Sequence, residues 1–223
     1  MDIKLFFQAI IKFALGVVLI GLLLFIPAKT MDYWNAWLFM GLLFIPMFIA
    51  GIVMMVKSPE LLKKRLNAKE EENEQKQVVL LSGLMFLAGF IVAGLNYRYG
   101  WIVLPNSVVI GASIIFIIAY ILYAEVLREN AYLSRTIEVQ ENQKVVDTGL
   151  YGIVRHPMYA TTILLFLSMP LVLGSYISFL IFLVYPFIIA KRIKNEEAVL
   201  EKDLEGYAEY KKKVKYKMIP FVW

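Results

Sequence analysis

The sequence contains no cysteine and a single histidine, His156. Without cysteine the chain forms no disulfide, offers neither a Cys–Zn site nor a catalytic thiol, and carries no lipid on cysteine. Any imidazole chemistry must therefore take place at His156, and we expect no metal site.

Charged residues are also scarce, at 18% of the chain, whereas 60% of the residues are hydrophobic. This composition is too apolar for an ordinary soluble domain. The apolar residues form runs close to the ~20 residues that a membrane-spanning helix needs, and these runs are far longer than the roughly 10-residue alternating segments of a barrel strand. We therefore predict an all-α integral membrane protein with about six transmembrane helices, near residues 5–26, 33–56, 78–96, 108–127, 158–173 and 177–190.

The last two predicted spans are short and are separated by Gly174 and Ser175, which favours a tight helical hairpin. Within the charged segment 57–77, Ser58 and Pro59 are typical of the start of a short surface helix. We predict a single membrane domain over residues 1–223, with four N-terminal spans in residues 1–127 and a distinct region over residues 128–223.

The basic residues follow a pattern of membrane topology. The loops on one side contain Lys57, Lys63, Lys64, Arg65, Lys69, Lys76, Arg128, Arg135, Lys144 and Arg155, and the tail from Lys191 onward is also basic. The opposite loops contain only Lys29 and Arg98. Since basic loops stay in the cytosol, both termini are predicted to be cytosolic. The net charge of +5 reflects this topology, and we expect no nucleic-acid partner.

The tail also has an apolar face, because Leu200, Leu204, Tyr207 and Val214 follow helical spacing. This pattern predicts a cytosolic, amphipathic C-terminal helix that lies on the membrane or on the bundle.

The sequence Arg155-His156-Pro157 stands at the start of the fifth predicted span. Proline disfavours helical geometry in the residue before it and fits the first turn of a helix, so His156 is expected in the extended approach at the bilayer surface. The N-terminus of that helix can hold an anion, such as the carboxylate of a cofactor. The alternative is that Arg155 and His156 only anchor the helix at the interface.

Arg192 and Glu196 lie four residues apart and share a helical face. Alone, they suggest an exposed ion pair of little energetic weight. A hairpin that starts at Pro157 returns the chain to its starting surface, however, and brings this pair close to His156 and Tyr159. Convergent ionisable groups at a membrane boundary favour a functional site. The Gly149–Gly152 segment lacks the third glycine of a dinucleotide loop, so we expect no Rossmann-type binding.

The residues from about 130 to the C-terminus resemble the isoprenylcysteine carboxyl methyltransferase family, which is related to membrane phospholipid methyltransferases. The resemblance depends on an ordered set of elements. This set consists of Gln140, Gln143-Lys-Val-Val-Asp-Thr-Gly-Leu-Tyr151, Arg155-His-Pro-Met-Tyr159, Pro170-Leu-Val-Leu-Gly-Ser175, Arg192 with Glu196-Glu197, Leu204-Glu-Gly-Tyr207-Ala-Glu-Tyr210 and Ile219-Pro220.

The resemblance implies a membrane methyltransferase that holds S-adenosyl-L-methionine at its cytosolic side, so that residues 128–223 form the cofactor-binding catalytic region. It implies catalytic roles for Arg192, Glu196 and His156, with Arg192 binding the methyl acceptor. It implies cofactor contacts from Gln140, Gln143, Lys144, Val145, Val146, Tyr151, His156, Pro157, Met158, Tyr159 and Glu196. The lipid-like or prenylated acceptor would enter from the bilayer, among the membrane lipids, through a gap between helices. Two positions depart from the family pattern: Thr161 replaces a glycine, and Gln143 replaces a histidine of many eukaryotic members.

Three alternatives stay open at this point. The acceptor can be a phospholipid amine or a small thiol, in which case His156 or Glu197 is the candidate proton acceptor. The chain can be an NADPH-dependent reductase of the sterol-reductase type, or a non-enzymatic membrane scaffold. The composition favours a prokaryotic plasma membrane, with the endoplasmic reticulum as the alternative, and the oligomeric state stays open.

Overall fold

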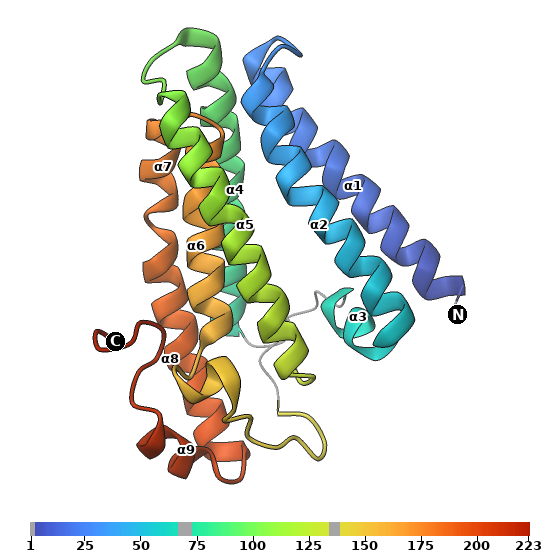
Figure 1. The fold of residues 1–223 in the computed structure, drawn as a ribbon, viewed down its shortest axis with the longest axis vertical. Coiled ribbons are helices and arrows are strands. Elements are labelled where there is room, and N and C mark those ends of the chain that lie inside the picture. The colour runs from blue at the N-terminus through green and yellow to red at the C-terminus, as the bar shows by residue number, and fades with distance from the viewer. Residues whose placement is uncertain (1–2, 67–72, 134–138) are drawn as a thin grey trace.

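The computed structural model describes residues 3–66, 73–133 and 139–223, and the regular secondary structure in these residues is helical. Figure 1 shows the helices as they follow one another along the chain. They are α1 (Ile3–Ala28), α2 (Trp34–Lys57), α3 (Pro59–Leu66), α4 (Asn73–Tyr99), α5 (Asn106–Glu129), η1 (Gly149–Gly152), α6 (Pro157–Val172), α7 (Tyr176–Phe182), α8 (Tyr185–Asp203) and α9 (Tyr207–Lys213). The described residues contain no β-strand, only an isolated antiparallel bridge between Val103 and Ser175. The all-α prediction is therefore confirmed.

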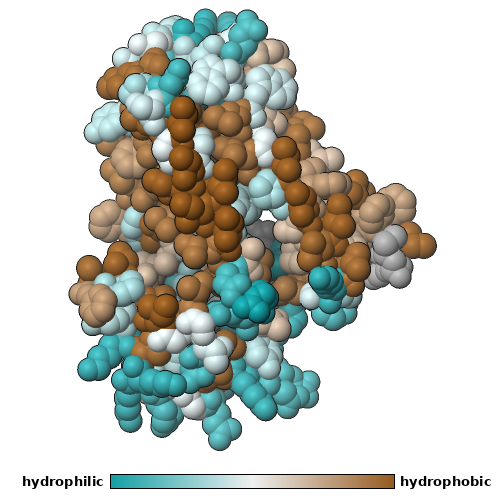
Figure 2. All heavy atoms as spheres, in the orientation of Figure 1, coloured by the Kyte–Doolittle hydropathy of each residue, from teal (hydrophilic) through white to brown (hydrophobic). Residues whose placement is uncertain are grey.

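Among the residues that the structure describes, five helical segments are long and apolar enough to cross a membrane: Ile3–Ala28, Trp34–Lys57, Lys76–Tyr99, Asn106–Glu129 and Tyr176–Asp203. The last of these comprises α7, a short turn and α8. The fifth predicted span, α6, has 16 residues, which is short for a full crossing, so the count of long helices is five rather than six. Apolar residues form a broad belt between two hydrophilic ends, as Figure 2 shows, and many large apolar side chains in this belt are exposed.

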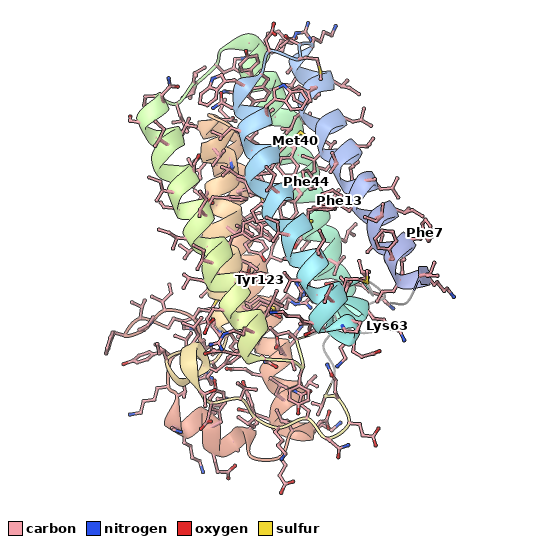
Figure 3. The ribbon with its side chains drawn as sticks, turned by 45° about the vertical axis from the view of Figure 1, so that its right-hand side comes forward. Phe7, Phe13, Met40, Phe44, Lys63 and Tyr123 are labelled. Atoms are coloured by element: carbon pink, nitrogen blue, oxygen red, sulfur yellow. The ribbon has the colours of Figure 1, made fainter. Side chains whose placement is uncertain are left out.

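Helices α4 to α8 form a bundle, against which α1 and α2 lean (Figure 1). Aromatic rings fill its centre: Phe86 of α4 packs edge-on against Phe166 of α6 and Phe182 of α7, at centroid distances of 4.8 and 5.4 Å. Between α1 and α2, Phe13 and Phe44 face one another at 5.6 Å, as Figure 3 shows. Such ring pairs stabilise a bundle where lipid supplies no hydrophobic driving force between helices.

The crossing of α1 and α4 depends on Gly94. A Cβ atom at this position would lie 2.5 Å from the Leu24 carbonyl oxygen and 3.1 Å from the Pro27 Cβ. We therefore expect Gly94→Val to force the two helices apart and to destabilise the protein by about 1–3 kcal/mol, measured as thermal unfolding in detergent.

Gly83→Val is the matched control, because Gly83 lies in the same helix and a Cβ there meets nothing within 4 Å. This variant should be as stable as the parent or slightly more stable, since glycine is a poor helix former. Equal losses at both positions would contradict the assignment of a close α1–α4 contact to Gly94.

The described parts of the basic loops lie toward one end of the bundle. In Figure 1 the lower part of the molecule holds α3, the segment directly before α6, α9 and both chain termini, whereas the α1–α2 and α4–α5 turns lie at the other end. The structure thus gathers the segments that the charge pattern assigns to the cytosol. Of the basic residues used in that argument, Lys69 and Arg135 lie outside the described residues.

The tail differs in detail from one amphipathic helix. α8 ends at Asp203, Gly206 adopts a left-handed conformation with φ of 82°, and the short α9 follows. Leu204, Tyr207, Tyr210 and Val214 do share a buried cluster, together with Leu200, but they pack against Val139 and Val145. The apolar face therefore covers the chain segment that leads to α6.

Candidate functional site

His156 is the residue before α6, and Pro157 is its first residue, as the sequence predicts. The backbone of His156 is outside the helical region, with φ of −124° and ψ of 60°. Inside the first turn, the N–H groups of Tyr159 and Ala160 both donate to the His156 carbonyl, at 3.1 and 3.2 Å. The helix terminus therefore offers fewer N–H groups to an anion than the sequence alone suggests.

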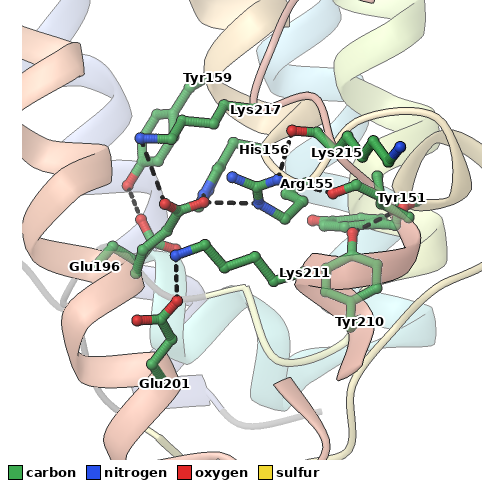
Figure 4. Close-up of polar contacts among 12 residues, drawn as sticks. Tyr151, Arg155, His156, Tyr159, Glu196, Glu201, Tyr210, Lys211, Lys215 and Lys217 are labelled. Atoms are coloured by element: carbon green, nitrogen blue, oxygen red, sulfur yellow. Dashed lines mark hydrogen bonds and ion pairs between the residues drawn. The ribbon is translucent and has the colours of Figure 1, made fainter. Parts of the chain in front are cut away.

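A buried ionic cluster surrounds the Glu197 carboxylate. Figure 4 shows its basic members, Arg155, His156 and Lys217, close to one another. Arg155 donates from Nε to Oε1 of Glu197 at 2.8 Å, and the His156 Nε2 lies 3.2 Å from the same oxygen. Lys217 Nζ lies 3.4 Å from the other oxygen. The side chains of Arg155 and Glu197 are only 4% and 7% exposed. Glu197 is thus held by three basic side chains, which leaves it poorly suited to accept a proton in catalysis.

The same arginine fastens the end of the chain. Its Nη1 donates to the carbonyl oxygens of Val214 and Lys215 at 2.7 and 2.8 Å. The backbone N–H groups of Arg155 and His156 donate to the carbonyls of Tyr216 and Lys217. The segment after α9 therefore lies directly against the start of α6.

Arg192, Tyr159 and Glu196 form a second polar chain. Arg192 Nε donates to the Tyr159 hydroxyl at 2.9 Å, and that hydroxyl donates to Glu196 Oε2 at 2.5 Å. The return of α7 and α8 alongside α6 brings Arg192 and Glu196 into contact with Tyr159, one of the two residues beside which the sequence placed them. Arg192 and Glu196 are therefore linked by hydrogen bonds through the Tyr159 hydroxyl, and they do not form the simple exposed ion pair that their spacing alone suggests.

The approach to α6 is shaped by the last turn of α5. Gly149 has a positive φ of 51°, and a Cβ atom there would collide with the Glu129 carboxylate. Glu129 accepts a hydrogen bond from the Leu150 N–H at 3.0 Å, and Asn130 donates to the Tyr151 hydroxyl at 3.1 Å. These contacts fix η1 and turn the Tyr151 ring into the interior.

These elements enclose a cavity with about 700 Å³ of empty space, part of which opens to solvent. Its lining includes Asn130, Leu133, Gln143, Lys144, Val145, Val146, Tyr151, Arg155, His156, Met158, Tyr159, Glu196, Leu200, Leu204, Tyr207 and Tyr210. Every residue expected to contact a cofactor lines this cavity except Gln140 and Pro157. The structure therefore gathers most of the candidate residues around one space at the hydrophilic end of the bundle.

Three candidate residues lie outside that lining. Gln140 donates from its side chain to the Tyr132 carbonyl at 2.7 Å and accepts from Lys64 of α3, so it fixes the loop. Pro157 supplies the helix start, and Arg192 reaches the cavity wall through Tyr159. Thr161, at the position where the family has glycine, is buried and donates to the Met158 carbonyl at 2.8 Å, so its hydroxyl is accommodated within α6.

Sequence reasoning did not identify several lining residues, which are Asn130, Leu133, Leu200, Leu204, Tyr207 and Tyr210. The repeated tyrosines after Leu204 were a usable signal, because an apolar face with two tyrosines suits a pocket wall as well as a membrane surface. The resemblance assigned Glu196, and not Glu197, to the cofactor site, although spacing alone does not separate the two. Of these neighbours, Glu196 lines the cavity and Glu197 is buried in the ion cluster.

The phenols of Tyr151, Tyr207 and Tyr210 share an electrostatic property. Burial is the main cause that raises the pKa of each hydroxyl above its ordinary value, and nearby carboxylates add to the effect. All three are therefore neutral at physiological pH and act as hydrogen-bond donors or acceptors rather than as phenolates.

Residues 99–202 match the family model described as Isoprenylcysteine carboxyl methyltransferase (ICMT) family. The match covers just under half of the chain and extends from the end of α4 to nearly the end of α8. No curated protein matches the chain in sequence. The matched region contains every candidate site residue that the sequence identified, whereas α9 and the segment after it lie beyond the match.

Proposed function

We propose that the chain transfers a methyl group from S-adenosyl-L-methionine to the carboxylate of an isoprenylcysteine-like or other lipidic acceptor. The proposal starts from the match of residues 99–202 to the isoprenylcysteine carboxyl methyltransferase family. The family and the apolar helices indicate a membrane methyltransferase. The observation that carries the finer proposal is the cavity itself, since its walls combine an available carboxylate, aromatic rings and neutral hydroxyls beside the apolar belt.

The donor set of the cavity fits this cofactor. When bound, S-adenosylmethionine supplies an electrophilic methyl group on a sulfonium and carries an ammonium and a carboxylate. Glu196 suits the ammonium, because the Arg155 and His156 side chains are already engaged with its neighbour Glu197 and do not compete for it. The rings of Tyr151 and Tyr159 suit the adenine and the sulfonium, where cation–π attraction contributes modestly. We propose that the cofactor is contacted by the lining residues Gln143 to Val146, Tyr151, His156, Met158, Tyr159 and Glu196. Gln140 shapes the loop before them, and Pro157 shapes the start of α6.

The acceptor side lies where this cavity meets the bundle. Arg192 is held by Tyr159, and Tyr185 of α8 donates to Thr162 of α6 at 3.3 Å, so polar groups extend from the cavity between the two helices. A carboxylate is already ionised at neutral pH and needs no general base. We propose that Arg192 holds it by a charge-assisted contact, so that positioning provides most of the catalysis.

This arrangement favours a carboxylate over an amine or a thiol as the acceptor. An amine or thiol must lose a proton, and the two candidate bases were His156 and Glu197. Both are engaged with one another, and Glu197 is engaged with Arg155 as well. The buried ion cluster therefore supports a reaction without general base catalysis.

Membrane orientation belongs to the same proposal. We propose that both termini and the cavity face the cytosol, because the basic loops gather at that end. In this orientation α6 and the α7–α8 pair form the last two membrane crossings. The cysteine-free composition, rich in isoleucine and phenylalanine, favours a prokaryotic plasma membrane over the endoplasmic reticulum.

A methyl-transfer assay in liposomes tests this function. The purified chain should move label from methyl-labelled S-adenosylmethionine to an S-prenylated cysteine with a free carboxylate. The matched acceptor with its carboxylate blocked as an amide should take up no label. Equal labelling of both acceptors, or labelling of lipid amines alone, would contradict a carboxylate acceptor.

Replacing Arg192 separates acceptor binding from cofactor binding. We expect Arg192→Ala to lower turnover by about 10- to 100-fold, the effect of losing one charge-assisted hydrogen bond, with a smaller change in affinity for S-adenosylhomocysteine. Lys191→Ala is the matched control, since Lys191 is exposed, adjacent in sequence, and donates to Gln77 on α4. A collapse of cofactor affinity in Arg192→Ala would move Arg192 into the cofactor site.

A further inference from the structure

Tyr207 has an unusual combination of burial and unsatisfied polarity. It is the first residue of α9 and is only 4% exposed. Its hydroxyl is buried and makes no hydrogen bond with any residue that the structure describes, although the side chain lines the cavity. A buried hydroxyl without a partner costs free energy, and such groups in native proteins call for an explanation.

The neighbouring tyrosine shows that the fold can satisfy such a group. The Tyr210 hydroxyl, three residues on, donates to the Tyr151 carbonyl at 2.7 Å (Figure 4). Tyr207 shares the same apolar cluster and the same cavity, but its hydroxyl has no equivalent acceptor in the described chain. Packing therefore accounts for the ring of Tyr207 and leaves its hydroxyl unexplained.

The surroundings of Tyr207 indicate which chemistry would satisfy the hydroxyl. Burial and the charges of Glu197 and Glu196 raise its pKa, so the phenol is neutral and can donate a proton in a hydrogen bond. Glu196 is the carboxylate that lines the cavity, whereas Glu197 is held by Arg155. A ligand that places its ammonium at Glu196 would bring its other polar atoms within the same part of the cavity.

The backbone explains how the ring reaches this position. Gly206 has a left-handed conformation, which turns the chain sharply after α8 and aims α9 back over the cavity. The segment after α9 is then fixed by Arg155, which bonds the carbonyls of Val214 and Lys215. Tyr207 is thus held over the cavity from both sides, in a part of the chain beyond the residues that match the family.

We propose that Tyr207 is a further cofactor-binding residue, whose hydroxyl donates a hydrogen bond to an oxygen or nitrogen acceptor of S-adenosylmethionine. This inference rests on the proposed function of the cavity. It makes the C-terminal segment part of the binding site rather than a cover on it. It also explains why position 207 has a tyrosine, since phenylalanine would fill the same space without leaving a buried hydroxyl unpaired.

Tyr207→Phe tests the inference because it removes the hydroxyl and keeps the ring. Calorimetric titration of the full chain in detergent should show affinity for S-adenosylhomocysteine about tenfold lower than in the parent. Without ligand, the variant should unfold at the same temperature as the parent or higher, since no hydrogen bond of the protein is lost. Tyr210→Phe is the matched comparison and should unfold at a lower temperature without ligand, because it loses the bond to Tyr151.

The outcomes separate this inference from the function on which it rests. If the parent binds S-adenosylhomocysteine and Tyr207→Phe binds it equally well, the role of Tyr207 is wrong while the methyltransferase proposal stands. If the parent does not bind the compound at all, the proposed cofactor is wrong and the assignment of Tyr207 to it is wrong as well. A lower unfolding temperature of ligand-free Tyr207→Phe, with unchanged affinity, would show that the hydroxyl stabilises the fold instead.

Discussion

Replacing Glu196 with alanine should lower the affinity for S-adenosylhomocysteine by about 100-fold or more. Charge-assisted hydrogen bonds contribute roughly 1.5–3 kcal/mol, the upper part of which corresponds to about 100-fold in affinity, and the variant also loses the attraction between the carboxylate and the ammonium. The Tyr159 hydroxyl also loses its acceptor, at 2.5 Å, so the Arg192–Tyr159 contact is less well fixed. Titration calorimetry measures the affinity, and circular dichroism checks that the variant folds.

Glu201→Ala is the matched control on the same helix. Glu201 is more exposed than the cavity carboxylate and pairs with Lys211 of α9 at the surface, a contact of little energetic weight. Affinity in this control should stay close to that of the parent. Unchanged affinity in Glu196→Ala would contradict a place for Glu196 in the cofactor site. The affinity of Glu196→Gln should lie between those of Glu196→Ala and the parent, since glutamine keeps the shape of the side chain and an acceptor for the Tyr159 hydroxyl.

The second large effect is on stability, at the buried ion cluster. Arg155→Ala should destabilise the protein by about 3–5 kcal/mol, because it leaves the Glu197 carboxylate buried with fewer partners. It also removes the donor from the carbonyls of Val214 and Lys215, so the segment after α9 should detach first. Thermal unfolding in detergent reports the overall loss, and limited proteolysis reports the tail.

An exposed pair provides the comparison. Arg128 and Glu125 form an ion pair in α5 with side chains 74% and 38% exposed, and Arg128→Ala should change stability by less than about 1 kcal/mol. The double variant Arg155→Met with Glu197→Leu should recover part of the loss, since an apolar pair of similar size can replace a buried ion pair. Similar losses in Arg155→Ala and Arg128→Ala would show that the cluster contributes little to the fold.

The fold class and the placement of charge were predictable because they depend on local composition. Long apolar runs require helices in lipid, and the basic loops between them share one side. The start of α6 was predictable in the same way, since Pro157 restricts the residue before it as well as its own backbone. The number of spans was harder to predict, because α6 is an apolar helix of 16 residues, shorter than the ~20 residues of a full span.

The different roles of Glu196 and Glu197 could not be predicted from local spacing, although the family resemblance assigns Glu196 to the cofactor site. The two residues are adjacent on α8, and their roles depend on which side of the helix meets the start of α6 and the end of the chain. Glu197 points at Arg155, 42 residues away in sequence, and at Lys217. Such long-range pairing leaves no trace in local spacing.

The tail illustrates the same limit. The spacing of Leu200, Leu204, Tyr207 and Val214 correctly indicates an apolar face, but an apolar face can cover either lipid or protein. Only the packing against Val139 and Val145, and the turn at Gly206, show that this face closes the cavity. Gln140 is a further case, because its bonds to Tyr132 and Lys64 occupy the side chain in holding the loop.

The most direct test of the central claim is calorimetric titration of the detergent-purified protein with S-adenosylhomocysteine, with NADPH titrated in parallel. Saturable binding of S-adenosylhomocysteine, and no heat of binding with NADPH, is the result that a methyltransferase cavity predicts. Binding of NADPH alone would contradict the account and favour a membrane reductase, and binding of neither in detergent or in lipid nanodiscs would contradict it in favour of a non-enzymatic scaffold.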